Sequence, residues 1–175
     1  MFMLKAAIID DGIDASQFKN VKSWVIKKDL SIENENIISV KDNHACTCLK
    51  IIQKYCDMSD VFWHSIKILN DDTKRGNIRQ FIEALRLCEQ LEVKIIHLSI
   101  GTRSYSDFNL IEKSIEALCD KGTIIIAAAC NEGTVAYPAC MNGVIGVKCD
   151  FSATDQQYLY LSLIHISEPT RLLSI

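Results

Sequence analysis

Short apolar runs alternate along the chain with longer segments in which apolar residues recur every three or four positions. Short runs bounded by glycine or polar residues are typical of strands buried on both faces of a sheet. The three-and-four spacing is typical of amphipathic helices. The predicted strands are residues 4–10, 23–26, 36–40, 61–69, 93–101, 123–129 and 143–149. The predicted helices are residues 44–56, 77–91 and 107–122.

The order of these elements predicts the fold class. Strands that alternate with helices imply parallel strands joined by right-handed crossovers. We therefore expect an α/β fold of three layers, α/β/α, with a mostly parallel sheet. The 175 residues are enough for one domain with a substantial core. Asn43 is the predicted N-cap of the first helix, which places His44 in its first turn, and Gly122 suits the end of the third helix.

Reactive side chains follow the ends of several predicted elements. Asp10 and Asp11 end the first strand, His44 opens the first helix, and Asn131 follows the strand at 123–129. Functional sites of parallel sheets lie at the carboxyl ends of the strands, so we expect the aspartate, histidine and asparagine side chains to lie close together at one edge of the sheet. Each residue alone also suits a plainer role as a strand-end acid, a helix cap or a turn residue. The two adjacent carboxylates should raise the pKa of at least one of them.

Composition and charge exclude several classes of protein. The net charge of −3 offers no basic surface for nucleic acid or anionic lipid. No apolar stretch is long enough to span a membrane, and the N-terminus lacks the pattern of a secretion signal. We therefore expect a cytoplasmic protein without nucleic-acid or membrane partners. Most of the eight cysteines lie in apolar segments, and the Cys46/Cys48 pair lacks the two-residue gap of a zinc motif, so no metal site is expected.

Two segments resemble motifs of the subtilisin-like serine proteases, the subtilase family. "AIIDDGID" is similar to a strand that ends in Ile-Asp-Ser/Thr-Gly-Ile-Asp, and Asp10 falls on the catalytic aspartate. "NHACTCLKII" resembles Gly-His-Gly-Thr-His-Val-Ala-Gly-Ile-Ile, and His44 falls on the catalytic histidine. Asp11 replaces a serine or threonine of the first motif.

Two further segments follow in the family's order. "IIHLSIGT" resembles Val-Ile-Asn-Met-Ser-Leu-Gly-Gly, and the resemblance implies that Ser99, Ile100 and Gly101 bind the substrate backbone. "AAACNEG" resembles Ala-Ala-Gly-Asn-Glu-Gly, and Asn131 falls on the oxyanion-hole asparagine. The resemblance covers about residues 4–150.

The resemblance implies a serine-type endopeptidase that acts on a peptide or protein. The aspartate would orient the histidine, the histidine would take the proton of a serine hydroxyl, and the asparagine would stabilise the oxyanion. No cofactor is expected. Calcium binding occurs in the family, but the sequence identifies no calcium site.

The serine motif of the family, Gly-Thr-Ser-Met/Val-Ala, does not occur in the 175 residues. The final segment, "LSLIHISEPTRLLSI", resembles the translated read-through of a sequencing adapter. We therefore expect residues 1–160 to be a C-terminally truncated subtilase catalytic domain and residues 161–175 a non-native tail. Such a fragment would be inactive by itself, with an unpaired sheet edge, uncovered apolar faces and marginal stability.

Two other interpretations stay open. The missing serine motif and the replacement of family glycines by Ala45 and Cys130 suit a subtilase-like module that binds a peptide without cleaving it. The acidic pair of the first strand also resembles that of phospho-receiver domains, which hold Mg²⁺ there. Such domains need a phosphorylatable aspartate after the third strand, whereas Asp57 follows a helical segment.

Overall fold

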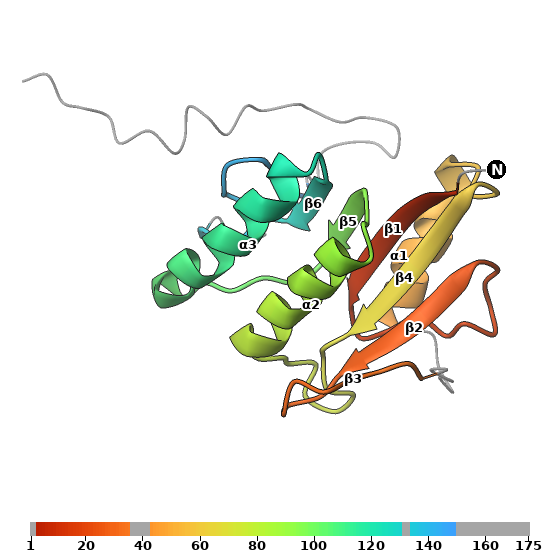
Figure 1. The fold of residues 1–175 in the computed structure, drawn as a ribbon, viewed down its shortest axis with the longest axis horizontal. Helices are drawn as coiled ribbons and strands as arrows, with labels where there is room; N and C mark the ends of the chain where they lie inside the picture. Colours follow the sequence, from red (N-terminus) through yellow and green to blue (C-terminus); the bar gives the residue numbers. More distant parts are fainter. Residues whose placement is uncertain (1–2, 36–42, 131–133, 150–175) are drawn as a thin grey trace, which may run out of the picture.

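A computed structural model describes residues 3–35, 43–130 and 134–149. Within them, helices and strands alternate along the chain much as the hydrophobic pattern predicts (Figure 1). The strands are β1 (Leu4–Asp10), β2 (Val21–Ile26), β3 (Ile32–Glu33), β4 (Val61–Lys67), β5 (Ile95–Leu98), β6 (Ile124–Ala128) and β7 (Val144–Val147). The helices are α1 (His44–Tyr55), α2 (Ile78–Gln90), the short 3₁₀ helix η1 (Tyr105–Asp107) and α3 (Phe108–Asp120).

The strands form one sheet in the order β3-β2-β4-β1-β5-β6-β7. Neighbouring strands are parallel except for β2 and β3, which pair antiparallel. The predicted α/β fold with a mostly parallel sheet is therefore confirmed. β1 lies in the middle of the sheet, so its last residue, Asp10, reaches the centre of the carboxyl edge, opposite Lys67 of β4.

Helices cover the sheet on both faces (Figure 1). Along β1, Ala7 and Ile9 point into the larger core under α2 and α3, whereas Ala6 and Ile8 pack against α1. This alternation follows from the two-residue period of a strand, and it explains why the first strand is apolar throughout. On the α1 side, the fully buried Leu49 anchors the helix to the sheet.

Part of the α1 side of the sheet carries exposed apolar side chains. Ile124 of β6 is 50% exposed, and Ile145 and Val147 of β7 are 49% and 51% exposed. The pairing of Ile126 with Ile145 and of Ala128 with Val147 places these side chains on one face. We call this set the β6–β7 face. The marginal stability expected for such a surface stays a prediction.

The local signals at the helix ends are confirmed. The Asn43 side chain accepts a hydrogen bond from the backbone N–H of Cys46, 2.9 Å away, as an N-cap should. Gly122 follows α3 with φ of +74°, a conformation that favours glycine. β3 was not predicted because two residues are too few to give a pattern. The predicted strand at 36–40 and the tail at 161–175 lie outside the described residues.

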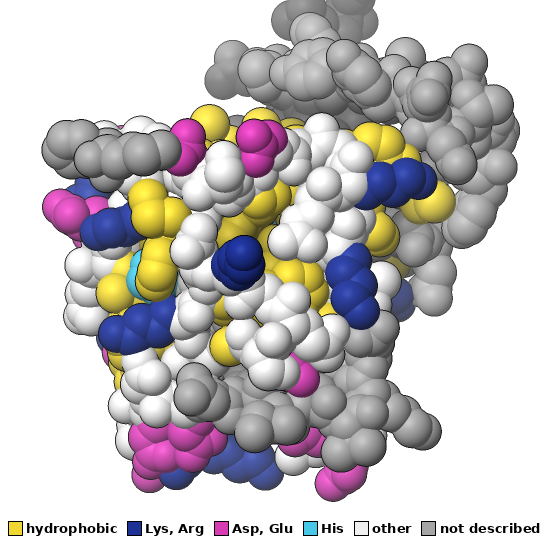
Figure 2. Space-filling view, turned by 90° about the vertical axis from the view of Figure 1, so that its right-hand side faces the viewer, with side chains coloured by type: hydrophobic (Ala, Val, Ile, Leu, Met, Phe, Trp, Pro, Cys, Tyr) yellow, Lys and Arg dark blue, Asp and Glu magenta, His cyan; other side chains and the backbone are white. Residues whose placement is uncertain are grey.

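The surface is mixed in character. On the face shown in Figure 2, basic and acidic side chains are interspersed with apolar ones. No helix in the described part of the chain has the length and apolar character needed to cross a bilayer.

Candidate active site

Asp10 and His44 meet where β1 ends and α1 begins. His44 Nδ1 lies 2.7 Å from Asp10 Oδ2. The Asp10 side chain is 2% exposed and the His44 side chain 57% exposed, so a buried carboxylate holds an accessible ring. A carboxylate can only accept, so the proton of this hydrogen bond belongs on Nδ1 of the neutral ring. Nε2 is then the nitrogen that can take up a proton.

The pKa of Asp10 lies above its usual value of 3.8. Burial raises it most, and the neighbouring charge of Asp11 adds to the effect. The hydrogen bond and the charge of His44 act in the opposite direction without cancelling the rise. The sequence expectation of a raised pKa agrees in direction, but its main cause is burial, and the like charge of Asp11 contributes less.

Asp11 binds the backbone at the start of α1. Its Oδ1 accepts from the N–H of Ala45 at 3.0 Å, and its Oδ2 accepts from the N–H of His44 at 3.1 Å and from Lys74 Nζ at 3.2 Å. Burial raises the pKa of Asp11, but these three donors outweigh it, and the pKa falls below 3.8. Asp11 is therefore an ionised carboxylate that accepts hydrogen bonds at the N-terminus of α1, where the helix dipole is positive.

Further hydrogen bonds fix the junction between β1 and α1. The Asn43 Nδ2 donates to the carbonyl of Gly12. The N–H of Ile13 donates to the buried Ser65 Oγ of β4 at 2.7 Å. The segment from Asp11 to Ile13 is therefore bound to both α1 and β4, which leaves the Asp10–His44 pair little freedom to separate.

A hollow of about 690 Å³ opens in front of this pair. Asp10 and His44 line it together with Ser99, Ile100 and Gly101, which follow β5. The structure thus brings five of the six sequence-predicted site residues to one hollow. The sixth, Asn131, lies outside the described residues. The other lining residues are Asp11, Asn43, Leu69, Lys74, Arg75 and Gly76.

A smaller, apolar cavity of about 210 Å³ adjoins the hollow and shares Leu69, Gly76, Ile100 and Gly101 with it. Its inner wall includes Phe81 of α2. Thr102 also lines this cavity, and it exchanges two backbone hydrogen bonds of 2.9 and 2.8 Å with Tyr137. A Cβ atom at Gly101 would lie 2.7 Å from the Tyr137 carbonyl oxygen, so only glycine fits this position without displacing its neighbour.

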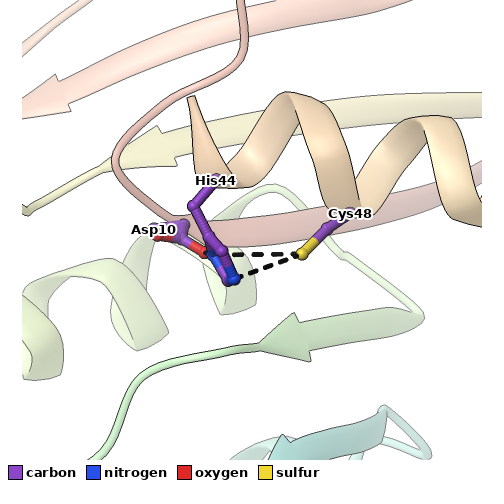
Figure 3. Close-up of side chains that lie close together, drawn as sticks. All are labelled: Asp10, His44 and Cys48. Carbon is purple, nitrogen blue, oxygen red and sulfur yellow. Dashed lines mark hydrogen bonds and ion pairs between the residues drawn. The ribbon is translucent and has the colours of Figure 1, made fainter. Parts of the chain in front are cut away.

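Cys48 lies one helical turn after His44 and points toward it (Figure 3). Its Sγ is 3.9 Å from each ring nitrogen of His44 and 3.6 Å from Ser99 Oγ. Burial raises the pKa of the Cys48 thiol, and the charges of Asp10 and Asp11 add to the rise. The thiol is therefore protonated near neutral pH rather than being an activated nucleophile.

The sequence reasoning paired Cys48 with Cys46 and so missed its contact with His44. The four-residue spacing from His44 was the available signal, since residues i and i+4 share a helix face. Cys46 lies elsewhere: it is buried, and its Sγ accepts from the N–H of Asp14 at 3.3 Å.

Two further histidines, His64 of β4 and His97 of β5, do not line the hollow. His64 is 5% exposed, and its Nδ1 accepts from Trp24 Nε1 at 3.2 Å. Burial lowers the pKa of His64 to about 4. Burial also lowers the pKa of His97. Both rings are therefore neutral at neutral pH; His64 is buried and His97 half-buried.

Comparison with known proteins identifies the family of the chain and solved structures with a similar fold. The sequence profile described as the Subtilase family matches residues 4–162. Among solved structures, the chain is similar to S41 psychrophilic protease (TM-score 0.60, 22% identity, covering 82% of this chain and 52% of that chain). It is also similar to a lanthipeptide protease (0.64, 15%, 82% and 47%) and to sphericase (0.63, 20%, 82% and 52%). The chain thus spans about half the length of these structures. No curated protein matches.

Proposed function

The chain belongs to the subtilase family, and on this premise we propose that Asp10 and His44 are the carboxylate and the general base of a serine-type endopeptidase. The observation that carries the proposal is the 2.7 Å contact between Asp10 Oδ2 and His44 Nδ1 at the mouth of the hollow. A buried carboxylate against one ring nitrogen fixes the tautomer and stabilises the imidazolium that forms during acyl transfer.

In this mechanism, His44 Nε2 takes the proton of a serine hydroxyl as the oxygen attacks the peptide carbonyl, and later returns it to the leaving amine. A hydroxyl is a weak nucleophile until a base accepts its proton. The 175 residues hold no Gly-Thr-Ser motif. The proposal therefore requires a serine from a further segment, and the 175-residue chain alone would bind peptide without turning it over.

The remaining roles concern the substrate, which we propose to be a peptide or protein. Ser99, Ile100 and Gly101 lie beside His44 around the hollow and would pair with the substrate backbone. The adjoining apolar cavity suits an apolar side chain of the peptide. Asn131 would donate to the oxyanion, a contribution of about 3–4 kcal/mol in related chemistry.

A serine-directed fluorophosphonate probe tests the enzyme proposal. A longer gene product carrying the serine segment should be labelled and should hydrolyse a peptide library, while the 175-residue chain should not be labelled. Asp10→Asn should lower kcat by about 10⁴-fold. Asp29→Asn, which alters an exposed loop aspartate bonded to Ser31, is the matched control and should retain activity. Labelling of the 175-residue chain, or equal activity of the two variants, would contradict the proposal.

The second candidate is a peptide-binding module without catalysis. It is favoured by a sequence that has no Gly-Thr-Ser motif in its 175 residues, although Asp10, His44 and the segment 99–101 line the hollow. Peptide binding at the hollow without labelling of any longer product would select it. The phospho-receiver alternative gains nothing from the structure: Asp57 lies between α1 and β4, binds the N–H of Ser59 at 2.9 Å, and does not line the hollow.

A further inference from the structure

Three side chains of different chemistry converge beside the hollow. Asp10 offers a carboxylate oxygen, His44 a ring nitrogen and Cys48 a sulfur, and these three atoms all lie within 4.8 Å of one another (Figure 3). We propose that Asp10, His44 and Cys48 bind a zinc ion, and that this ion holds His44 in a form that cannot act as a base.

The mixture of donors selects the metal. Zinc is bound in proteins by cysteine sulfur, histidine nitrogen and carboxylate oxygen, and three protein ligands with an open fourth position for water make a common arrangement. Calcium and magnesium prefer oxygen ligands alone, so one carboxylate beside a thiol and an imidazole suits them poorly. The site is therefore one for zinc, or for a softer cation such as cadmium.

The spacing needs only a small adjustment. The Cys48 Sγ lies 3.9 Å from each ring nitrogen of His44. A tetrahedral zinc ion with ordinary bond lengths places sulfur and nitrogen about 3.5 Å apart. The 2.7 Å contact between Asp10 Oδ2 and His44 Nδ1 must also open, to about 3.3 Å, for both atoms to bind one ion. Rotation of the three side chains would make both changes. His44 is accessible from the hollow, which gives the ion a path of entry.

The surroundings suit a bound cation. Cys48 stands where the family motif has valine, so the sulfur adds a ligand at a position that is ordinarily apolar. Lys74 is directed to Asp11, 3.2 Å away, rather than to Asp10. Among the described residues, no lysine forms an ion pair with Asp10, and the charge of its carboxylate would offset that of the metal.

Binding would be reversible. As the zinc–sulfur bond forms, the thiol proton leaves to water. Where Nδ1 becomes the ligand, its proton moves to Nε2, and a chelator reverses both changes. Metal binding depends only on the three side chains. The inhibitory consequence rests on the proposed function, because only a catalytic His44 would lose activity when its nitrogen is occupied.

Zinc titration of the 175-residue chain, kept reduced with a phosphine, tests the binding. Cys48→Val removes the sulfur at nearly constant volume, and His44→Ala removes an exposed ring. Cys56→Ser, at the exposed end of the same helix, is the matched control. By calorimetry, we expect both ligand variants to bind zinc at least tenfold more weakly than the parent, and Cys56→Ser to bind like the parent. Equal affinity of Cys48→Val and the parent would overturn the site.

A second measurement does not depend on whether the ligand variants fold. In the parent chain and in Cys56→Ser, zinc should shift the ¹⁵N resonances of the His44 ring and leave those of His64 in place. Cobalt should give the intense visible absorption of a tetrahedral site containing sulfur. Unmoved His44 resonances at saturating zinc would overturn the site whatever the variants do. If the site binds zinc but an active longer product keeps its hydrolysis rate in zinc, the proposed inhibition is wrong and the zinc site stands. If no longer product has peptidase activity, the proposed function is wrong, and the zinc-binding result still stands.

Discussion

Asp10 and Asp11 are consecutive in the chain, yet they hold the same histidine in two different ways. Asp10 bonds the ring of His44, whereas Asp11 accepts from the backbone N–H of His44. One carboxylate therefore sets the direction of the ring, and the other sets the position of the helix that carries it. Their pKa values move in opposite directions because Asp10 is dominated by burial and Asp11 by its donors.

Replacing Asp10 should stabilise the protein at neutral pH. Because the pKa of Asp10 is raised, the folded chain binds this proton more tightly than the unfolded chain, and stability is lost as the pH rises above about 3.8. Asp10→Asn removes this loss and keeps an oxygen for the N–H of Asp11. We expect the free energy of unfolding to rise at neutral pH in urea titrations, because the mutant no longer buries a charged carboxylate. The gain should shrink as the pH falls toward about 4.

Asp11→Asn should lower the free energy of unfolding at neutral pH, the opposite of Asp10→Asn, and it serves as the matched control. Its pKa is lowered, so the carboxylate contributes stability that is present above about 3.8 and is lost as the pH falls through the folded-state pKa. We expect a loss of about 1 kcal/mol at neutral pH, since a helix-start acceptor is weakened. A shift of the same sign in both variants would contradict the division of roles.

Leu49 and Ile51 lie on the same helix, but one is buried and the other exposed. Their replacement by alanine should therefore have different effects on the free energy of unfolding. Leu49 is 1% exposed and Ile51 55% exposed. Leu49→Ala should lower the free energy of unfolding by about 2–5 kcal/mol, because it leaves a cavity between α1 and the sheet. Ile51→Ala should change it by less than about 0.5 kcal/mol. Chemical denaturation followed by circular dichroism measures both, and comparable losses would show that α1 is not packed as described.

Gly101 should be needed for peptide binding rather than for folding alone. A side chain there would meet the Tyr137 carbonyl and push the Thr102–Tyr137 pairing away from the hollow. Gly101→Ala should weaken peptide affinity by about tenfold, the equivalent of about 1.4 kcal/mol. Gly122→Ala is the control: its positive φ should reduce stability by about 1 kcal/mol, and peptide affinity measured by fluorescence anisotropy should stay unchanged.

Acid should destabilise the protein through His64. The unfolded chain binds a proton on this ring near pH 6.5, whereas the folded chain binds it only near pH 4. The free energy of unfolding should therefore fall by roughly 2–3 kcal/mol between these values as the pH is lowered. His64→Gln keeps an acceptor for Trp24 but does not titrate, so its unfolding free energy should depend less on pH in this window. An unchanged slope would assign the acid sensitivity to other groups.

The sequence predicted those parts of the fold that depend on local pattern. β1 and α1 were predictable from an apolar run and from the Asn43 cap, and their meeting at Asp10 and His44 follows from the rule that strand carboxyl ends share an edge. The approach of Cys48 to His44 required knowing at which residue the helix begins. The contact of Lys74 with Asp11 depends on the path of a long loop, which no periodicity encodes.

The exposed β6–β7 face has a practical consequence for handling the protein. Dyes that fluoresce on binding to exposed hydrophobic surface should bind the β6–β7 face in the fully folded chain. This fluorescence is usually attributed to partly unfolded states. Melting curves recorded with such dyes would start from a high background and understate the transition. Backbone ellipticity, which does not respond to that surface, would track the same transition without this bias.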